Sequence, residues 1–167
     1  MPILKAGSKS EIGFHLNGRA VIGSAEPRML LSDFLRHEIG AYGTHVGCEH
    51  GVCGACTVQI DGQPQRACLT LAVQVEGRSV ETVEGLAGPE GRLSVLQEAF
   101  RANFAVQCGY CTAGILMSVE AFLRDCPEPT EEQIRDLLSG HLCRCTGYTN
   151  IVCAVKAAAA AAAAEKT

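Results

Sequence analysis

Ten cysteines in a chain of 167 residues constrain this sequence more than any other feature, because eight of them fall into two groups of four. Clustered cysteines indicate either a disulfide framework or metal ligation. The first residues contain no apolar segment of the length of a secretory signal, and the chain has no Arg-Arg pair, so we expect a cytoplasmic location. Because stable disulfides are rare in a reducing cytosol, the cysteines are predicted to be metal ligands.

Charge and hydropathy narrow the class of protein further. The formal net charge is -4, with both signs mixed along the chain, which excludes the basic stripe that nucleic-acid binding requires. No apolar run approaches the roughly 20 residues of a membrane span. The sequence has no phosphate loop, no dinucleotide fingerprint and no paired nucleophile and base. We therefore expect a protein with no catalytic residues, no bound flavin and no membrane span.

The first half of the chain predicts strands. Apolar and polar residues alternate around Asn17-Gly18 and again around Asp61-Gly62, and both dipeptides are typical of two-residue hairpin turns. Between these hairpins, residues 29–40 have helical spacing and end at Gly40. A further short strand is expected in residues 78–86. These elements predict a small mixed sheet with a helix across it.

The second half of the chain predicts helices. Residues 93–104 and 111–124 have apolar faces at helical spacing, Thr130 and Gln133 form a capping box for a third helix, and a fourth begins near Tyr148. The predicted fold class is α+β, with one domain over 1–88, a four-helix domain over 89–156 and an alanine-rich tail over 157–167. The tail is expected to fray because it offers little surface to bury.

The first cysteine group has the spacing of a plant-type ferredoxin. Cys48, Cys53 and Cys56 form C-x4-C-x2-C, and Cys68 follows twelve residues later. Glycines at 47, 51 and 54 allow positive φ angles and close backbone approach, so several N-H groups can point at sulfur. A four-cysteine zinc site usually has two short clips instead. The pattern therefore predicts a 2Fe-2S cluster.

The second cysteine group is less specific. Cys108 and Cys111 form C-x2-C at the start of a predicted helix, and Cys143 and Cys145 form C-x-C in a later loop, with thirty-one residues between the pairs. Four thiolates at two helix ends can hold a second 2Fe-2S cluster, whose negative charge favours helix N-termini. Structural zinc remains an alternative at this point, because thiolates also bind zinc readily.

Three segments carry a family resemblance. GCEHGVCGACTV, QCGYC and LCRCTGY closely resemble the small iron-sulfur subunits of the xanthine oxidase family of molybdenum hydroxylases, and the similarity covers nearly the whole chain. The resemblance implies a plant-ferredoxin-like β-grasp domain followed by a helical domain with its own 2Fe-2S cluster. Three positions depart from the family pattern. Ala113 stands where many relatives have Pro, His141 where many have Asn, and His45 where some have Lys.

The resemblance also implies cofactors and partners. A large subunit would hold molybdenum on a pyranopterin, and a medium subunit would hold FAD, in a hetero-oligomer expected to be a dimer of heterotrimers. Electrons would pass through the helical-domain cluster, then through the ferredoxin-like one and on to FAD. Gln107 and Cys145 would contact the pterin, although Gln107 could instead be a capping amide. The expected substrate is an aromatic N-heterocycle, with aldehydes and carbon monoxide open.

Further expectations concern the remaining cysteines and the histidines. Cys126 and Cys153 fit neither group, and packing in the core is expected for both. His37, His45, His50 and His141 are expected to lie at the surface or near the cluster ligands rather than to ligate iron. The alternative functions are a free-standing two-cluster ferredoxin and a zinc-stapled interaction module.

Overall fold

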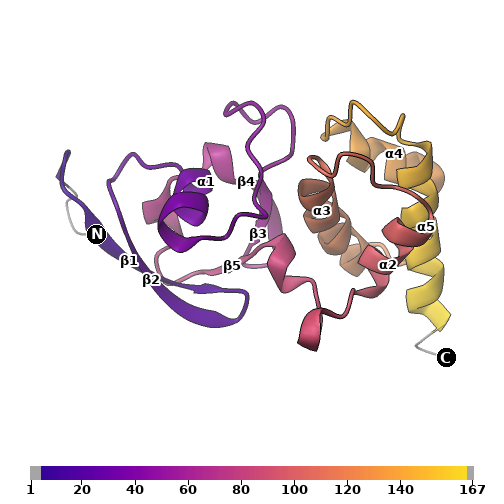
Figure 1. Cartoon of the computed structure of the whole chain (residues 1–167), viewed down its shortest axis with the longest axis horizontal. Helices are drawn as coiled ribbons and strands as arrows, with labels where there is room; N and C mark the ends of the chain where they lie inside the picture. The colour runs from indigo at the N-terminus through magenta and orange to yellow at the C-terminus, as the bar shows by residue number, and fades with distance from the viewer. Residues whose placement is uncertain (1–4, 165–167) are drawn as a thin grey trace.

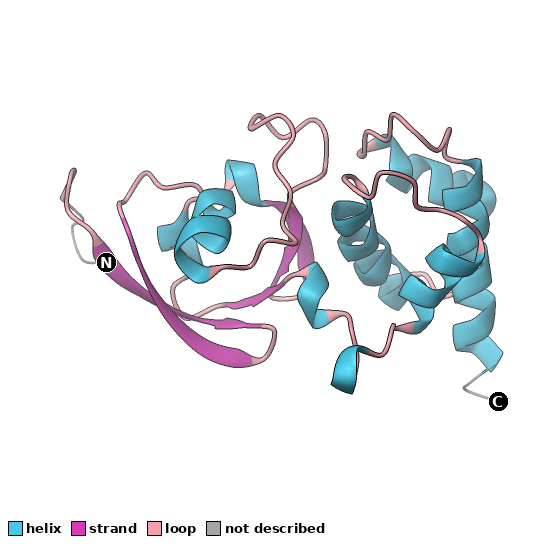
Figure 2. Cartoon of the chain, viewed as in Figure 1, coloured by secondary structure: helices cyan, strands magenta, loops and turns pink. Residues whose placement is uncertain are grey.

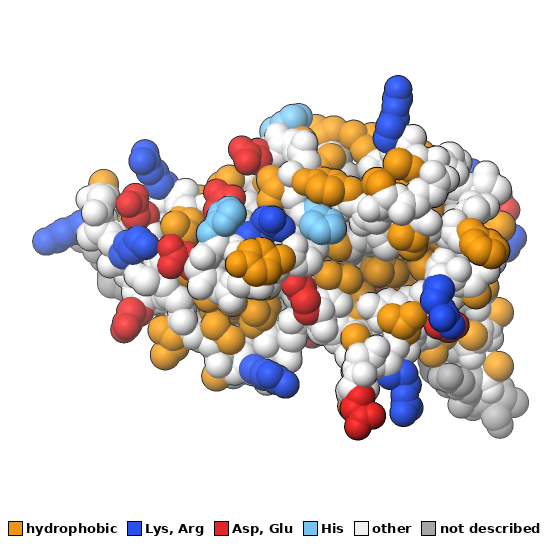
Figure 3. Space-filling view, in the orientation of Figure 1, with side chains coloured by type: hydrophobic (Ala, Val, Ile, Leu, Met, Phe, Trp, Pro, Cys, Tyr) orange, Lys and Arg blue, Asp and Glu red, His pale blue; other side chains and the backbone are white. Residues whose placement is uncertain are grey.

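The computed structural model describes residues 5–164 and has a sheet-containing part and a helical part side by side (Figure 1). The expectation of an α+β fold is confirmed, since a mixed sheet and its helices are followed by a largely helical second half (Figure 2). No helix within the described residues is long and apolar enough to cross a membrane. Charged side chains of both signs are interspersed on the face shown in Figure 3.

Two tight hairpins build most of the sheet. Strands β1 (Ser10–Leu16) and β2 (Arg19–Ala25) pair antiparallel, as do β3 (Thr57–Ile60) and β4 (Gln63–Arg66). The turn residues have φ of 50° and 77° at Asn17-Gly18 and 49° and 79° at Asp61-Gly62, which is the geometry that these dipeptides favour. The two predicted hairpins are confirmed.

Strand β5 (Ser79–Glu81) joins the hairpins into one sheet of order β2-β1-β5-β3-β4. It pairs parallel with β1 and antiparallel with β3. Short 3-10 helices connect the strands and lead out of the sheet: η2 (Ala67–Leu69), η3 (Ala72–Val75), η4 (Val83–Gly85) and η5 (Pro89–Gly91).

The predicted helix after the first hairpin is present, but most of it has π-helical hydrogen bonding. It starts as α1 (Leu31–Asp33), continues as the π-helix η1 (Phe34–Ile39), and ends at Gly40 with φ of 84°. Phe34 is fully buried and packs against Phe14 of the sheet, with ring centroids 5.8 Å apart. The wider turn was not foreseen, because periodicity in six residues does not separate π from α geometry.

The second half contains α2 (Val95–Ala102), α3 (Thr112–Asp125), α4 (Glu131–Ser139) and α5 (Thr149–Ala164). The capping box of Thr130 and Gln133 is confirmed, and Ser94 with Gln97 forms a second box at the start of α2. Helix α5 packs along α2, and the core between the helices includes Phe100, Ile115, Ile134 and Ile151.

Only the first part of the alanine run is packed, and residues 160–164 of helix α5 are exposed. Helix α5 continues to Ala164, and Ala158 is only 2% exposed within the core of the helical part. Ala158 and Ala159 are buried where α5 packs along α2, whereas the fraying of the later alanines stays a prediction. Residues 165–167 of the predicted tail lie outside the described residues.

The two parts of the fold meet where α3 packs against β3. Gln59 of β3 is fully buried there, and its amide Nε2 donates to the carbonyl of Met117 at 2.9 Å. Its Oε1 accepts from the guanidinium of Arg124 at 2.6 Å. These polar contacts fix how the sheet and the helices sit against each other, because a buried amide without partners is unfavourable.

Candidate metal centres

The loop of residues 47–56 brings three cysteines together between η1 and β3. Positive φ angles at Glu49, Gly51 and Gly54 fold it tightly. The backbone N-H of Cys53 donates to the sulfur of Cys48 at 3.4 Å. Bonds from the N-H groups of Cys53 and His50 lower the pKa of the Cys48 thiol to about 6. The expectation that backbone N-H groups of this loop point at sulfur is confirmed for Cys48.

Cys68 approaches this loop from η2, in the core of the sheet part. Cys56 and Cys68 are 2% and 3% exposed. Burial and the neighbouring Cys56 together raise the pKa of Cys68 to about 11, while the N-H of Gly51 acts in the opposite direction. A buried thiol of this kind loses its proton readily only beside a strong positive charge such as a bound metal.

The second cysteine set gathers at the N-terminal end of α3. Cys108 and Cys111 directly precede that helix, while Cys143 and Cys145 lie in the loop between α4 and α5. The sulfur of Cys145 lies 3.6 Å from that of Cys108. Burial, together with a hydrogen bond with the Cys143 thiol, raises the pKa of Cys111 to about 12. Each close pair therefore takes one thiol from each motif.

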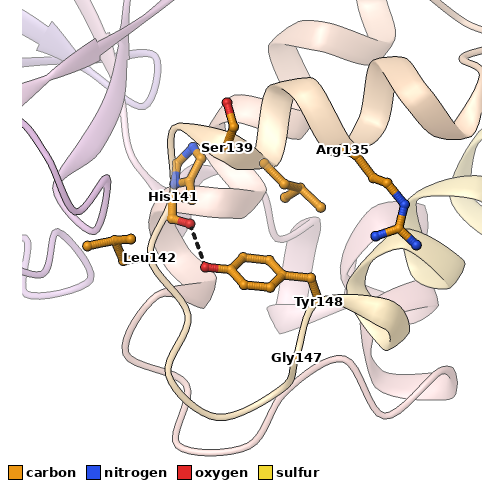
Figure 4. Close-up of a pocket in the computed structure, with 7 residues that line it drawn as sticks. Arg135, Ser139, His141, Leu142, Gly147 and Tyr148 are labelled. Atoms are coloured by element: carbon orange, nitrogen blue, oxygen red, sulfur yellow. Dashed lines mark hydrogen bonds between the residues drawn. The ribbon is translucent and has the colours of Figure 1, made fainter.

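The hydroxyl of Tyr148 holds the loop of Cys143 in place. The backbone N-H of Cys143 donates to the hydroxyl of Tyr148 at 2.8 Å, and that hydroxyl donates to the carbonyl of His141 at 3.0 Å (Figure 4). A pocket of about 360 Å³ lies beside the loop, lined by Arg135, Leu138, Ser139, His141, Leu142, Gly147 and Tyr148. The role of Tyr148 in holding this loop was not predicted from the sequence, where the available signal was its position five residues after the ligand candidate Cys143.

The two cysteine loops touch each other directly. The backbone N-H of Leu142 donates to the carbonyl of Cys53 at 3.0 Å. One hydrogen bond therefore joins the neighbour of Cys143 in the second set to a cysteine of the first set. A small cavity of about 140 Å³ between the loops is lined by residues from both, including Cys53, Cys108 and Cys111. The loops of the two cysteine sets are therefore in direct contact within the chain.

Tyr110 adds a second link between the loops. Its ring stacks on His45 with centroids 4.8 Å apart, and its hydroxyl donates to the carbonyl of Val46 at 2.7 Å. The ring nitrogen Nδ1 of His45 donates to the Tyr110 carbonyl at 2.9 Å. The residue inside the C-x2-C motif thereby holds the loop that precedes Cys48.

The other histidines occupy different environments. His141 is only 2% exposed, and burial lowers its pKa to about 4, with the charge of Arg66 acting in the same direction. Its Nε2 lies 2.8 Å from the hydroxyl of Ser118. His37 and His50 are exposed, and His50 bonds the carbonyl of Cys48 through Nδ1.

The remaining predicted residues lie outside the two thiol clusters. Gln107 is exposed immediately before Cys108, and its amide has no hydrogen-bond partner among the described residues, so a capping role is not observed. Cys126 is half-buried and Cys153 is exposed. The expectation of core packing is wrong for Cys153, because it lies on the outer face of α5.

The donor chemistry of the two sets fits iron-sulfur clusters. Each set offers four free thiols, and all ten cysteines are free within the described residues. In the same part of the chain, no three His, Cys, Asp or Glu side chains converge as they would around one metal ion. A 2Fe-2S cluster instead divides its four thiolates between two irons, which agrees with thiols arranged in close pairs. Fold and sites define an iron-sulfur electron-transfer protein.

Comparisons with known proteins identify the family. A family described as a 2Fe-2S binding domain matches residues 82–156, and one described as a 2Fe-2S iron-sulfur cluster binding domain matches residues 38–95. The chain is 51% identical to caffeine dehydrogenase subunit gamma of Pseudomonas sp. (strain CBB1), over 89% of this chain and 90% of that subunit. It is 52% identical to the nicotine 6-hydroxylase small subunit of Paenarthrobacter nicotinovorans, over 87% of each.

A solved structure extends this similarity to three dimensions. A chain of quinoline 2-oxidoreductase from Pseudomonas putida 86 superposes with a TM-score of 0.91 and 48% identity, covering 96% of this chain and 100% of that one. The chain belongs to the small 2Fe-2S subunits of the xanthine oxidase family of molybdenum hydroxylases. It is the electron-transfer subunit of a multi-subunit oxidoreductase of this family.

Proposed function

We propose that this chain carries its two clusters on eight named cysteines and works as a fixed relay. The ferredoxin-like cluster is held by Cys48, Cys53, Cys56 and Cys68, and the other by Cys108, Cys111, Cys143 and Cys145. The hydrogen bond from the Leu142 N-H to the Cys53 carbonyl carries the proposal, because it joins the two ligand loops within the chain itself. A relay needs short, rigid connections of this kind.

The proposal includes the domain division predicted from the sequence. The ferredoxin-like β-grasp domain spans residues 1–88 and is followed by the four-helix domain of residues 89–156. Gly88 lies between η4 and η5, in the connection that leaves the sheet and enters the helical part. One cluster belongs to each domain, and the ligand loops face each other across the junction.

The direction of electron flow is carried over from the family resemblance, and the exposure of the helical-domain ligands supports it. Cys108 and Cys145 are exposed, and Gln107 beside them has a free amide within the described structure. These residues would contact the pterin of the large subunit, so electrons enter at the helical-domain cluster. They leave from the ferredoxin-like cluster towards FAD on the medium subunit. Molybdenum on the pterin supplies the substrate oxidation itself.

An apolar surface near Gln107 supports a permanent partner. Phe104 is 79% exposed, and Val106 and Tyr110 are also exposed close to it in sequence. Exposed apolar groups of this size beside a functional site are typical of a protein interface. A free-standing two-cluster ferredoxin would leave this surface in water. We therefore propose a hetero-oligomer with large and medium subunits, assembled as a dimer of heterotrimers.

The substrate proposal rests on relatives. The caffeine, nicotine and quinoline enzymes are named for N-heterocyclic compounds. We propose that the complex hydroxylates an aromatic N-heterocycle. The free thiols of the chain favour a cytoplasmic location for the complex, because thiols and iron-sulfur ligands persist in reducing compartments.

A pair of cysteine variants tests the ligand assignment. Cys145 and Cys153 are both exposed, so replacing either with serine leaves the core unchanged. In the purified complex, Cys145→Ser is expected to lose the EPR signal of one cluster and about two of its four irons, while Cys153→Ser keeps both signals. Loss of a cluster in Cys153→Ser, or two intact clusters in Cys145→Ser, would refute the assignment. Co-purification of a molybdenum-containing subunit tests the partner.

A further inference from the structure

A hydroxyl group lies against one ligand candidate of the helical part. The Oγ1 of Thr146 is 3.0 Å from the sulfur of Cys143. Among the hydrogen bonds that cysteine sulfurs make within residues 5–164, this one alone involves a hydroxyl. The sulfur of Cys48, in the other set, is bonded by backbone N-H groups instead.

The surrounding bonds set the direction of this contact. The backbone N-H of Tyr148 donates to the same Thr146 oxygen at 3.2 Å, so the oxygen is already an acceptor there. The hydroxyl proton remains available for the sulfur. A cysteine that ligates iron is a thiolate and has no proton to give, so Thr146 must be the donor and Cys143 the acceptor.

We propose that Thr146 tunes the redox potential of the cluster in the helical part by donating its hydroxyl proton to the Cys143 thiolate. The inference rests on the proposed ligand set. Reduction adds negative charge to the cluster and its sulfur ligands, and a donor to sulfur stabilises that charge. Thr146 therefore makes this cluster easier to reduce.

The test compares Thr146→Val with Thr146→Ser in the assembled complex. Valine keeps the shape of threonine and removes the donor, while serine keeps the hydroxyl. EPR-monitored redox titration is expected to show a lower midpoint potential for the helical-part cluster in Thr146→Val and a wild-type value in Thr146→Ser. The ferredoxin-like cluster should keep its midpoint in both variants and serves as an internal control.

Two results would overturn the inference: an unchanged midpoint in Thr146→Val, or an equal shift in Thr146→Ser, which would indicate a purely structural role. If Thr146→Val does not assemble, pulsed EPR of the wild-type complex after brief transfer to D2O decides. A rapidly exchanging deuteron coupled to the helical-part cluster supports the hydroxyl donor, and its absence contradicts it. A wild-type complex with one cluster signal would overturn the ligand set as well, whereas two signals without a shift would overturn this inference alone.

Discussion

Gly114 is the residue whose replacement tests most sharply how the two cluster loops are packed. It lies in the first turn of α3, directly against the loop that carries Cys53 and Cys56. A Cβ at this position would lie 2.1 Å from the carbonyl oxygen of Gly54 and 3.0 Å from that of Ala55. Both atoms belong to the backbone, so no side-chain rotation can relieve the clash.

The expected cost follows from two opposing effects. Ordinary contacts of a Cβ begin near 3.4 Å, so the helix and the loop must separate by more than 1 Å. Overpacking of this kind costs about 3 kcal/mol when backbone has to move. Alanine in place of glycine returns about 1 kcal/mol of helix propensity. The Gly114→Ala variant should therefore lose about 2 kcal/mol of stability, a shift of about 4 to 8 °C in melting temperature for a chain of this size.

The assay follows unfolding and cluster loss together. Thermal melts of the complex, monitored by circular dichroism and by the visible absorbance of the clusters, are compared with those of Gly13→Ala. Gly13 is the matched control because a Cβ there meets its nearest atom, a carboxylate oxygen of Glu76, at 3.8 Å. Equal melting temperatures for the two variants would refute the claim that α3 and the cluster loop are in direct backbone contact.

Three further substitutions test separate parts of the account. Tyr148→Phe removes the hydroxyl that holds the C-x-C loop. The free energy of unfolding is therefore expected to fall by about 1 to 2 kcal/mol, and a chelator should remove iron faster. Gln59→Leu leaves Met117 and Arg124 without their buried hydrogen-bond partner. The free energy of unfolding, measured by denaturant titration, should fall by about 1 to 3 kcal/mol. Asp61→Asn keeps a residue suited to the turn but removes a carboxylate. A backbone N-H and an arginine lower the pKa of Asp61, so its stabilising effect is present above about pH 4 and is lost as the pH falls below that value.

Each of these has its own contradicting result. A wild-type rate of iron removal in Tyr148→Phe would show that the clasp is unimportant. A Gln59→Leu variant as stable as the wild type would mean that the polar junction contributes nothing. For Asp61→Asn, the difference in stability from the wild type should shrink in acid, and a difference that is constant from pH 7 to pH 3 would contradict the assigned pKa shift.

Local chemistry was readable from the sequence. The hairpins depend on Asn17-Gly18 and Asp61-Gly62, which adopt positive φ angles at little energetic cost. Each turn type can therefore be predicted from two residues. The capping box at Thr130 is equally local. The cysteine spacings also lie within short segments, which is why the sequence alone suffices to propose both ligand sets.

Contacts between segments far apart in the chain could not be predicted from the sequence. Nothing near Gly114 in sequence indicates that Gly54 lies against it, and nothing near Leu142 indicates the bond to Cys53. The burial of Ala158 depends on α2, more than fifty residues earlier in the chain. Each of these contacts joins segments that are far apart in the sequence. Periodicity and composition do not predict which residues of two such segments lie opposite each other.

The most direct test of the central claim, a fixed relay of two 2Fe-2S clusters, is iron and acid-labile sulfide analysis with EPR of the dithionite-reduced complex. We expect about four irons and four sulfides per chain and two distinguishable 2Fe-2S signals that broaden each other through magnetic coupling. Two irons with bound zinc, or a single 2Fe-2S signal, would contradict the account, because the second cysteine set would then be a zinc site or no site.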